Sequence, residues 1–192
     1  ALTDKALKNP AVDFVVWPET AFVPRIMWHF NYRSDEARFN LVTELLDYMD
    51  SKTVPFIIGN DHGEFGYNKK NKSQILDYNS ALLFIPKENT YPPDPKIYRK
   101  VKLVPFTEYF PYEKTFPWLY QILIEADTHF WEPGDDFNVF MLDDFMVGTP
   151  ICFEDTFGYL SAEFVAKGAQ MLLNLSNDFW SLSVPAELQH SQ

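Results

Sequence analysis

Apolar and polar residues follow one another along the chain in two patterns, one typical of buried strands and the other of amphipathic helices. Short runs of β-branched and aromatic residues, bounded by Pro or Gly, predict strands at residues 12–17, 54–59, 79–85, 137–141, 145–148 and 171–175. Apolar residues on neighbouring helical positions predict helices at residues 34–51, 118–124 and 156–167. Gly168 follows the last helix and is expected to end it.

The segments between these elements are polar or rich in Pro and aromatic residues. Residues 21–33 are expected to be irregular, residues 60–77 to form a surface loop or hairpin, and residues 98–105 to be extended. Both ends, residues 1–10 and 186–192, have the pattern of helical turns. We therefore expect the chain to be cut within helices at each end.

The order of the predicted elements indicates the fold class. Helices and strands interleave, yet predicted strands also follow one another without a helix between them. This order favours an α+β fold in which mixed sheets carry helices on their outer faces. No repeat, low-complexity tract or second domain is visible, so we expect a single domain over residues 1–192, truncated at both ends.

Composition narrows the classes of function. The 192 residues include 16 Lys and Arg against 27 Asp and Glu, a net charge of −11, and 46% of them are apolar. The apolar share supports a folded core, and the acidic balance argues against nucleic-acid binding, which needs clustered Lys and Arg. The sequence contains no run of 18 apolar residues, so it predicts no membrane span. It has a single cysteine, which excludes an internal disulfide.

Cys152 is the candidate nucleophile. It follows a predicted strand and precedes a predicted helix, so it lies on a tight turn where N–H groups at the helix start can serve as oxyanion donors. Glu154, two residues later, lies on the same face if the backbone is extended. The alternatives are a buried cysteine used as a small hydrophobe and a glutamate that caps the helix.

A cysteine nucleophile needs a base and a group that stabilises negative charge. None of the four histidines follows a strand beside a matching Asn or Asp, so a Cys-His protease arrangement lacks support. Glu19 leaves the carboxyl end of a strand and is the better-placed base, with a solvated loop glutamate as the alternative.

Lys100 belongs to the extended segment at residues 98–105, where it shares a face with Lys102. The alternative is a solvated lysine on a strand edge. His and carboxylate neighbours lack the spacing of metal ligands, and no Gly-rich phosphate loop is present. We expect neither a metal nor another cofactor.

Three segments, taken in sequence order, resemble the nitrilase or carbon-nitrogen hydrolase superfamily. They are residues 17–21 (WPETA), 98–109 (YRKVKLVPFTEY) and 148–154 (GTPICFE). Within that superfamily, WPET, LVPFTEY and a downstream LSND at residues 175–178 look like the bacterial apolipoprotein N-acyltransferase family. The resemblance implies a nitrilase-like αββα sandwich of mixed sheets with outer helices, of which this chain is a partial domain.

The resemblance also implies roles for five residues. In a Glu-Lys-Cys triad, Glu19 is the general base, Lys100 the cation that steadies the oxyanion and the thiolate, and Cys152 the nucleophile. Glu108 matches a second family glutamate that positions the lysine and the substrate, and Glu154 matches another acidic residue of the nucleophile motif. No cofactor is implied.

The reaction implied by the resemblance is ping-pong acyl transfer. The cysteine takes a fatty acyl chain from a phospholipid, and the α-amino group of a diacylglyceryl-cysteine apolipoprotein then accepts it. Members of this family carry the domain on the periplasmic face of the bacterial inner membrane, held there by transmembrane helices. We expect those helices to lie outside this chain, and no nucleic acid is an expected partner.

Several residues near the motifs are candidate substrate contacts, or parts of lids at the membrane interface, with ordinary core packing as the alternative. These residues are Trp28, Phe110, Trp118, Asn177 and Trp180. Phe153 stands where the family often has a tyrosine.

Two other functions are weighed against acyl transfer. A soluble carbon-nitrogen hydrolase, an amidase or nitrilase acting on a small amide or nitrile, shares the triad, but the motif at residues 103–109 argues against it. An inactive domain that binds lipid or peptide is disfavoured because Glu19, Lys100 and Cys152 are all present.

Overall fold

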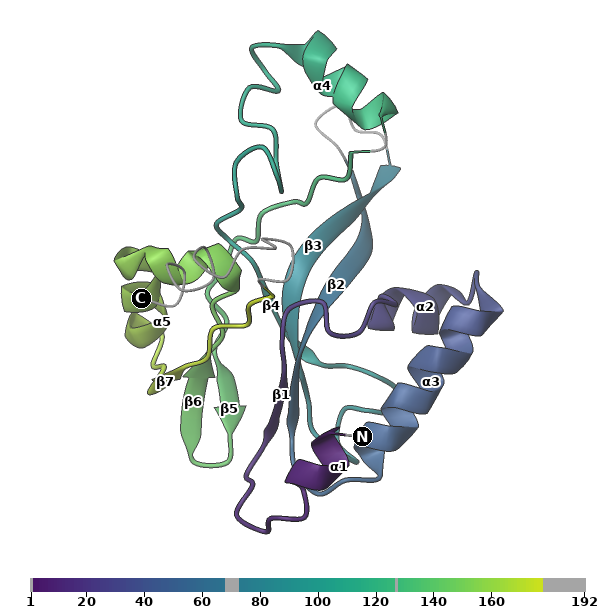
Figure 1. The fold of residues 1–192 in the computed structure, drawn as a ribbon, viewed down its shortest axis with the longest axis vertical. Helices are drawn as coiled ribbons and strands as arrows, with labels where there is room; N and C mark the ends of the chain where they lie inside the picture. Colours follow the sequence, from purple (N-terminus) through teal and green to yellow (C-terminus); the bar gives the residue numbers. More distant parts are fainter. Residues whose placement is uncertain (1, 68–72, 127, 178–192) are drawn as a thin grey trace.

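Two β-sheets packed face to face form the centre of the structure, a computed structural model that describes residues 2–67, 73–126 and 128–177 (Figure 1). The first sheet has the strand order β1-β2-β3-β4 and the second β5-β6-β7. The strands of the first sheet are β1 Val15–Trp17, β2 Phe56–Tyr67, β3 Ser73–Phe84 and β4 Lys96–Arg99. Those of the second are β5 Phe140–Leu142, β6 Phe145–Gly148 and β7 Met171–Leu172.

Both sheets mix parallel and antiparallel pairs. β1 is parallel to β2, whereas β2 with β3 and β3 with β4 are antiparallel. In the second sheet β5 is antiparallel to β6, and β6 is parallel to β7. The parallel pairs are joined through helices, because a parallel pair requires a crossover that a short hairpin cannot provide.

The helices match the predicted pattern in most places. They are α1 Leu2–Ala6, α2 Ile26–Tyr32, α3 Glu36–Asp50, α4 Pro117–Glu125 and α5 Gly158–Ala166, with a 3₁₀ helix at Cys152–Thr156. α3 begins after Asp35, whose side chain accepts a hydrogen bond from the Arg38 N–H at 3.0 Å. Gly168, at φ +102°, follows α5 as expected.

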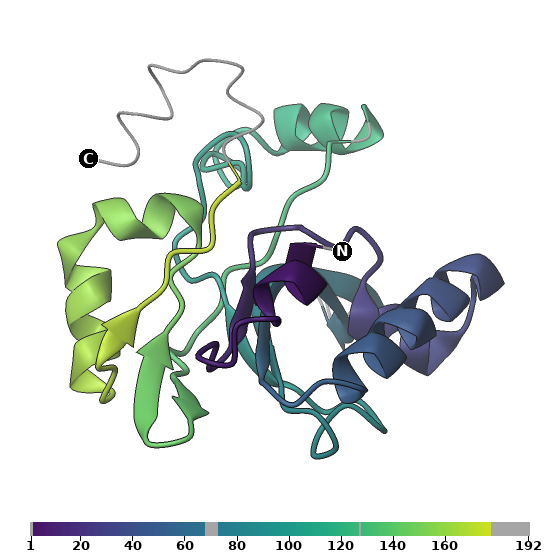
Figure 2. The same cartoon turned by 60° about the horizontal axis from the view of Figure 1, so that its bottom comes forward.

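Alternating side chains of β2 divide the interior into two cores. Ile57 packs between the sheets with Phe140 and Val147, whereas Phe56 and Ile58 pack with residues of α2 and α3. α2 and α3 therefore cover the outer face of the first sheet, and α5 lies on the far side of the second (Figure 2). This arrangement confirms the expected α+β class with outer helices.

Two expectations about the first half of the chain need correction. The segment 21–33 is not irregular throughout, because α2 forms within it. Asn60 accepts a hydrogen bond from the Ile26 N–H at 3.0 Å and so fixes the start of that helix. The polar stretch after residue 59 continues β2 to Tyr67 and returns as β3, so the hairpin alternative is correct and the strands are longer than predicted.

The segment between β4 and β5 carries α4 away from the sheets. In Figure 1, α4 lies at one end of the molecule, beyond the tips of β2 and β3. The confirmed helix at residues 118–124 is thus part of a projecting arm. Within the described residues, every helix is too short or too polar to cross a bilayer.

Candidate active site

The inner face of the first sheet changes from apolar to polar partway along its central strands. On β3 the positions that face the second sheet run Leu83, Ala81 and then Asn79, and the register pairs Asn79 with Asp61 of β2. Because side chains alternate across a strand, the layer between the sheets is a closed core at one end and polar at the other. The candidate site lies at this change.

Glu19 lies just beyond the end of β1. Its backbone passes so close to β2 that a Cβ added to Gly59 would lie 2.6 Å from Glu19 Cα and 2.6 Å from Pro18 O. Thr20 follows at φ +49°, a left-handed conformation that is uncommon for Thr. The Glu19 side chain is only 12% exposed. The absence of a side chain at Gly59 therefore allows the Glu19 backbone to lie this close to β2.

Lys100 is fully buried and pairs with a carboxylate. Its Nζ lies 2.7 Å from Glu108 Oε1 and 4.0 Å from Glu19 Oε1. Glu108 Oε2 in turn accepts a hydrogen bond from the Val104 N–H at 2.7 Å. A buried ammonium is stable only beside a compensating charge, and Glu108 provides it. The alternative of a solvated strand-edge lysine is wrong, because Lys100 is fully buried and lies just past the end of β4.

Asn79 joins these groups, although sequence reasoning assigned it no role. Its Nδ2 donates to Glu19 Oε1 at 2.6 Å and lies 3.4 Å from Glu108 Oε1. Its backbone carbonyl accepts a hydrogen bond from the Lys100 N–H at 2.8 Å. The available sequence signal was a polar residue at the inward position after Leu83 and Ala81.

Cys152 reaches the same place from the second sheet. It follows β6 at φ +51°, again in the left-handed region, and opens the 3₁₀ helix rather than an α-helix. Its own N–H donates to Leu175 O at 3.0 Å, so that expected oxyanion donor is occupied. The Phe153 N–H is instead hydrogen-bonded to the thiol.

The Cys152 thiol is neutral in the resting site. Burial, and then the negative charge of Glu19, raise its pKa to about 11. The nearby Lys100 ammonium lowers that pKa, as do hydrogen bonds from Ser176 and Phe153, but these effects do not outweigh burial. A group in this state needs a base before it can attack, and Glu19 is the carboxylate beside it.

Glu154 links the nucleophile turn to the lysine segment. Its buried carboxylate accepts hydrogen bonds from the N–H groups of Ile151, Val101 and Lys102 at 2.8, 2.8 and 2.9 Å and from the Tyr98 hydroxyl. Burial raises the pKa of the Glu154 carboxyl. The contact with Ile151 caps the start of the 3₁₀ helix, so the capping alternative is correct.

A cavity of about 360 Å³ opens where the two sheets meet. It is lined by Glu19, Thr20, Asn79, Val104, Thr107, Glu108, Trp131, Cys152 and Asn177. The thiol and two of the predicted carboxylates thus face one space, with the Lys100 ammonium in contact with Glu108. The structure places a thiol, two carboxylates and an ammonium close together around this cavity.

The other candidate residues are distributed differently. Asn177 lines the cavity, whereas the Trp28 ring packs at a tilt against Tyr32 with 4.4 Å between ring centroids, and Phe110 is buried within the arm. Trp118 is 63% exposed on α4. Trp180 lies outside the described residues.

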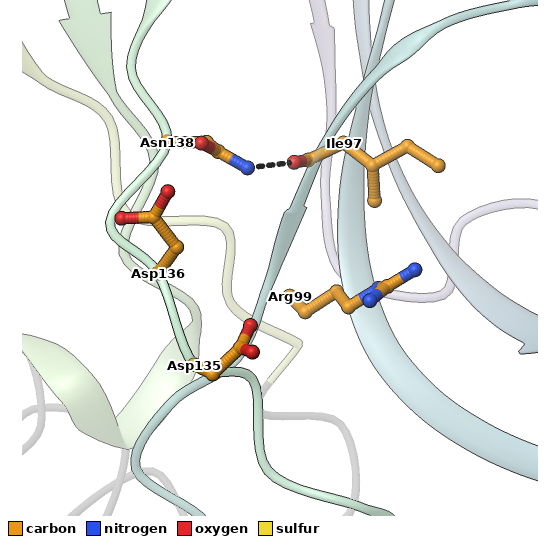
Figure 3. Close-up of a pocket in the computed structure, with 5 residues that line it drawn as sticks. All are labelled: Ile97, Arg99, Asp135, Asp136 and Asn138. Carbon is orange, nitrogen blue, oxygen red and sulfur yellow. Dashed lines mark hydrogen bonds between the residues drawn. The ribbon is translucent and has the colours of Figure 1, made fainter.

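A second cavity, of about 210 Å³, lies between β4 and the segment before β5 (Figure 3). Figure 3 shows the Arg99 guanidinium pointing away from Asp135 and Asp136, and it instead pairs with Glu64 at 2.6 Å. This cavity shares no lining residue with the first. Within the described part of the chain, no three His, Cys, Asp or Glu side chains cluster in a way that holds a metal ion.

Comparison with known proteins identifies the family. The family model "Carbon-nitrogen hydrolase" matches residues 1–192. The chain belongs to the carbon-nitrogen hydrolase family. Among relatives of this carbon-nitrogen hydrolase, apolipoprotein N-acyltransferase 1 of Treponema denticola is 53% identical over 197 residues, covering 98% of this chain and 36% of that protein. The protein of the same name from Treponema pallidum is 52% identical over 190 residues, covering 98% and 35%.

Solved structures support the fold of this carbon-nitrogen hydrolase. A carbon-nitrogen hydrolase from Helicobacter pylori has a TM-score of 0.52 at 21% identity, covering 91% of this chain and 51% of that one. A nitrilase-superfamily member from Saccharomyces cerevisiae has a TM-score of 0.55 at 20% identity, covering 91% and 55%. The chain spans 36% and 35% of the length of the two Treponema relatives.

Proposed function

We propose that this chain is the catalytic domain of a bacterial N-acyltransferase, which moves a fatty acyl chain from a phospholipid to the N-terminal amine of a diacylglyceryl-cysteine apolipoprotein. The observation that carries this proposal is the meeting of Glu19, Cys152 and the Lys100–Glu108 pair at one cavity. The names and the roughly half-identical sequences of the two Treponema relatives select this chemistry within the family.

The first half-reaction acylates Cys152. The Glu19 carboxylate takes the thiol proton, and Sγ attacks the ester carbonyl carbon of the phospholipid. The Lys100 ammonium and the Phe153 N–H stabilise the oxyanion that forms. Collapse breaks the ester C–O bond, and the Glu19 carboxylic acid returns its proton to the departing lysophospholipid oxygen.

The second half-reaction transfers the acyl chain. The neutral α-amine of the apolipoprotein attacks the thioester carbonyl carbon, and Glu19 accepts one amine proton. The C–S bond then breaks and an amide forms. The cysteine sulfur leaves as a thiolate and regains a proton from Glu19, so that both groups return to their starting states.

A lipid substrate suits the surface beside the cavity. The arm that carries α4 exposes several large apolar side chains to solvent, namely Phe106, Tyr112, Phe116, Trp118, Ile122 and Ile124. Aromatic and aliphatic side chains of this kind are favoured at a membrane interface. We place the domain on the periplasmic face of the inner membrane, with membrane helices supplied by parts of the protein outside this chain.

Intact-mass analysis of the full-length enzyme tests the proposal. Incubation with a phospholipid labelled in its acyl chain should add one fatty acyl group to the wild-type protein and none to Cys152→Ala. Addition of a diacylglyceryl-cysteine peptide should remove the adduct and yield the N-acylated peptide. Wild-type protein that carries no adduct and releases ammonia from small amides would instead establish a soluble-type hydrolase.

A further inference from the structure

The amide of Asn79 stands between the two carboxylates of the candidate site. Its Nδ2 donates to Glu19 Oε1 at 2.6 Å and lies 3.4 Å from Glu108 Oε1. The backbone of Asn79 also holds the Lys100 N–H at 2.8 Å. Asn79 therefore touches the site's base, its buried lysine and that lysine's partner.

The Glu19 carboxylate takes its hydrogen bond from an uncharged donor, because the Lys100 ammonium is bonded to Glu108. Lys100 Nζ is 2.7 Å from Glu108 but 4.0 Å from Glu19, so its strong hydrogen bond goes to Glu108. Two carboxylates in one buried space tend to share a proton unless each has its own donor. Within the described residues, the Asn79 amide supplies the hydrogen bond to Glu19.

The oxygen of the Asn79 amide indicates that the observed orientation of the amide costs free energy. Asn79 Oδ1 is buried and has no hydrogen-bond partner among the described residues. A flipped amide would direct its oxygen at the Glu19 carboxylate. The carboxylates of Glu19 and Glu108 therefore fix the orientation of the Asn79 amide. An apolar side chain would avoid the unsatisfied oxygen but would provide no donor.

We infer that Asn79 is a positioning residue, whose amide keeps the Glu19 carboxylate turned toward Cys152 and separate from Glu108. It acts through Glu19 and does not itself touch the reacting atoms. This inference rests on the proposed function only in naming Glu19 as the base for the Cys152 thiol.

Alkylation of Cys152 by iodoacetamide in the full-length enzyme, followed across pH, tests the inference without any lipid. Asn79→Leu removes the donor and should slow alkylation near neutral pH about ten- to hundredfold, the usual effect of losing a hydrogen bond to a charged group. Ser80→Ala alters the next side chain, also buried and without a partner among the described residues, and should leave the pH profile unchanged.

Asn79→Asp is the sharper variant because it preserves the size of the side chain. The new carboxyl can donate to Glu19 only while it holds a proton, and Asp61, Glu108 and Lys100 are the other charged groups near it. Its alkylation rate relative to wild type should therefore fall as pH rises. Because the charge of a new carboxylate also raises the thiol pKa, the uncharged Asn79→Leu must show a loss as well before the effect is assigned to the missing donor.

The outcomes separate the two hypotheses. A pH-independent ratio for Asn79→Asp, or wild-type rates in Asn79→Leu, would overturn the positioning role. If wild-type enzyme forms no acyl adduct from phospholipid while the alkylation results hold, the acyltransferase proposal fails and the positioning role stands.

Discussion

The Lys100 ammonium lies 2.7 Å from Glu108 Oε1, and both side chains are buried. This pair places a positive charge near Cys152 without exposing it to water, because Glu108 offsets the desolvation of the lysine. The second hydrogen bond of Glu108, from the Val104 N–H at 2.7 Å, fixes the carboxylate in turn. The Lys100 ammonium is thus held by Glu108, whereas the Lys100 backbone N–H is held by the Asn79 carbonyl of β3.

Replacement of Glu108 by Gln should both destabilise the domain and slow acylation. Loss of one partner of a buried ion pair typically costs about 3 to 5 kcal/mol, because the other charge is left uncompensated. Thermal unfolding and single-turnover acylation of the full-length protein measure the two effects. The exposed Glu88→Gln provides the charge-matched control, and equal behaviour of the two variants would contradict the role of the pair.

Replacement of Glu19 by Gln should separate thiol ionisation from catalysis. The Glu19 charge is the second cause, after burial, that raises the thiol pKa to about 11. Its removal should therefore lower the pKa of Cys152, while acyl transfer falls by roughly a hundredfold or more because the base is lost. The ultraviolet absorbance of the thiolate, followed against pH, reports the first effect. Lys100→Met should shift the thiol pKa upward, and a shift in the same direction for both variants would show that the charges do not act as assigned.

Replacement of Glu154 by Gln should cost about 1 to 3 kcal/mol of stability, because an amide NH₂ would then face backbone N–H donors inside the protein. Tyr98→Phe removes one donor to Glu154 but keeps the ring contact with Phe164, so its effect should be smaller. Denaturant unfolding measures both. A larger loss for Tyr98→Phe would mean that the Tyr98 hydroxyl, rather than the set of backbone N–H donors, carries most of the stabilisation at Glu154.

Exposed aromatic residues of the arm should affect acylation from phospholipid but not the reactivity of the Cys152 thiol. Trp118→Ser removes a ring that is 63% exposed, and should reduce acylation from phospholipid vesicles by about tenfold while leaving iodoacetamide alkylation unchanged. Tyr159→Ser, on α5, changes a ring that is 57% exposed and serves as the control. A loss of alkylation in Trp118→Ser would show that the ring supports the fold.

Local patterns predicted the elements well, and long-range contacts explain what they missed. The short apolar run at residues 79–85 correctly predicted a strand, and apolar spacing correctly predicted α3 and α4. α2 could not be predicted because its start depends on Asn60, which lies 34 residues away in sequence. Burial of Lys100 likewise depends on Glu108 and on the folding of the segment between them, which no periodicity describes.

The site residues also divide into those that the sequence predicted and those that only the fold reveals. Glu19, Lys100, Glu108 and Cys152 follow from motifs, and the structure places them together. Asn79 has no motif of its own and is visible only when β3 is read as alternating inward and outward positions. Glycines that shape the site are harder still to recognise from the sequence, because their role depends on another backbone segment that packs against them in the fold.

Gly59 is such a position, and Gly158 provides a matched control. A Cβ added at Gly59 would lie 2.6 Å from Glu19 Cα, whereas one added at Gly158 would meet nothing within 4 Å. Gly59→Ala should therefore displace Glu19 and reduce acylation by at least about tenfold, while Gly158→Ala keeps wild-type activity. Because the obstructing atoms are backbone, no side chain can move aside to relieve the contact. Single-turnover acylation measures the difference, and thermal unfolding checks that each variant folds. Full activity in Gly59→Ala would mean that the Glu19 backbone can shift without cost, and that the close approach does not set the position of the base.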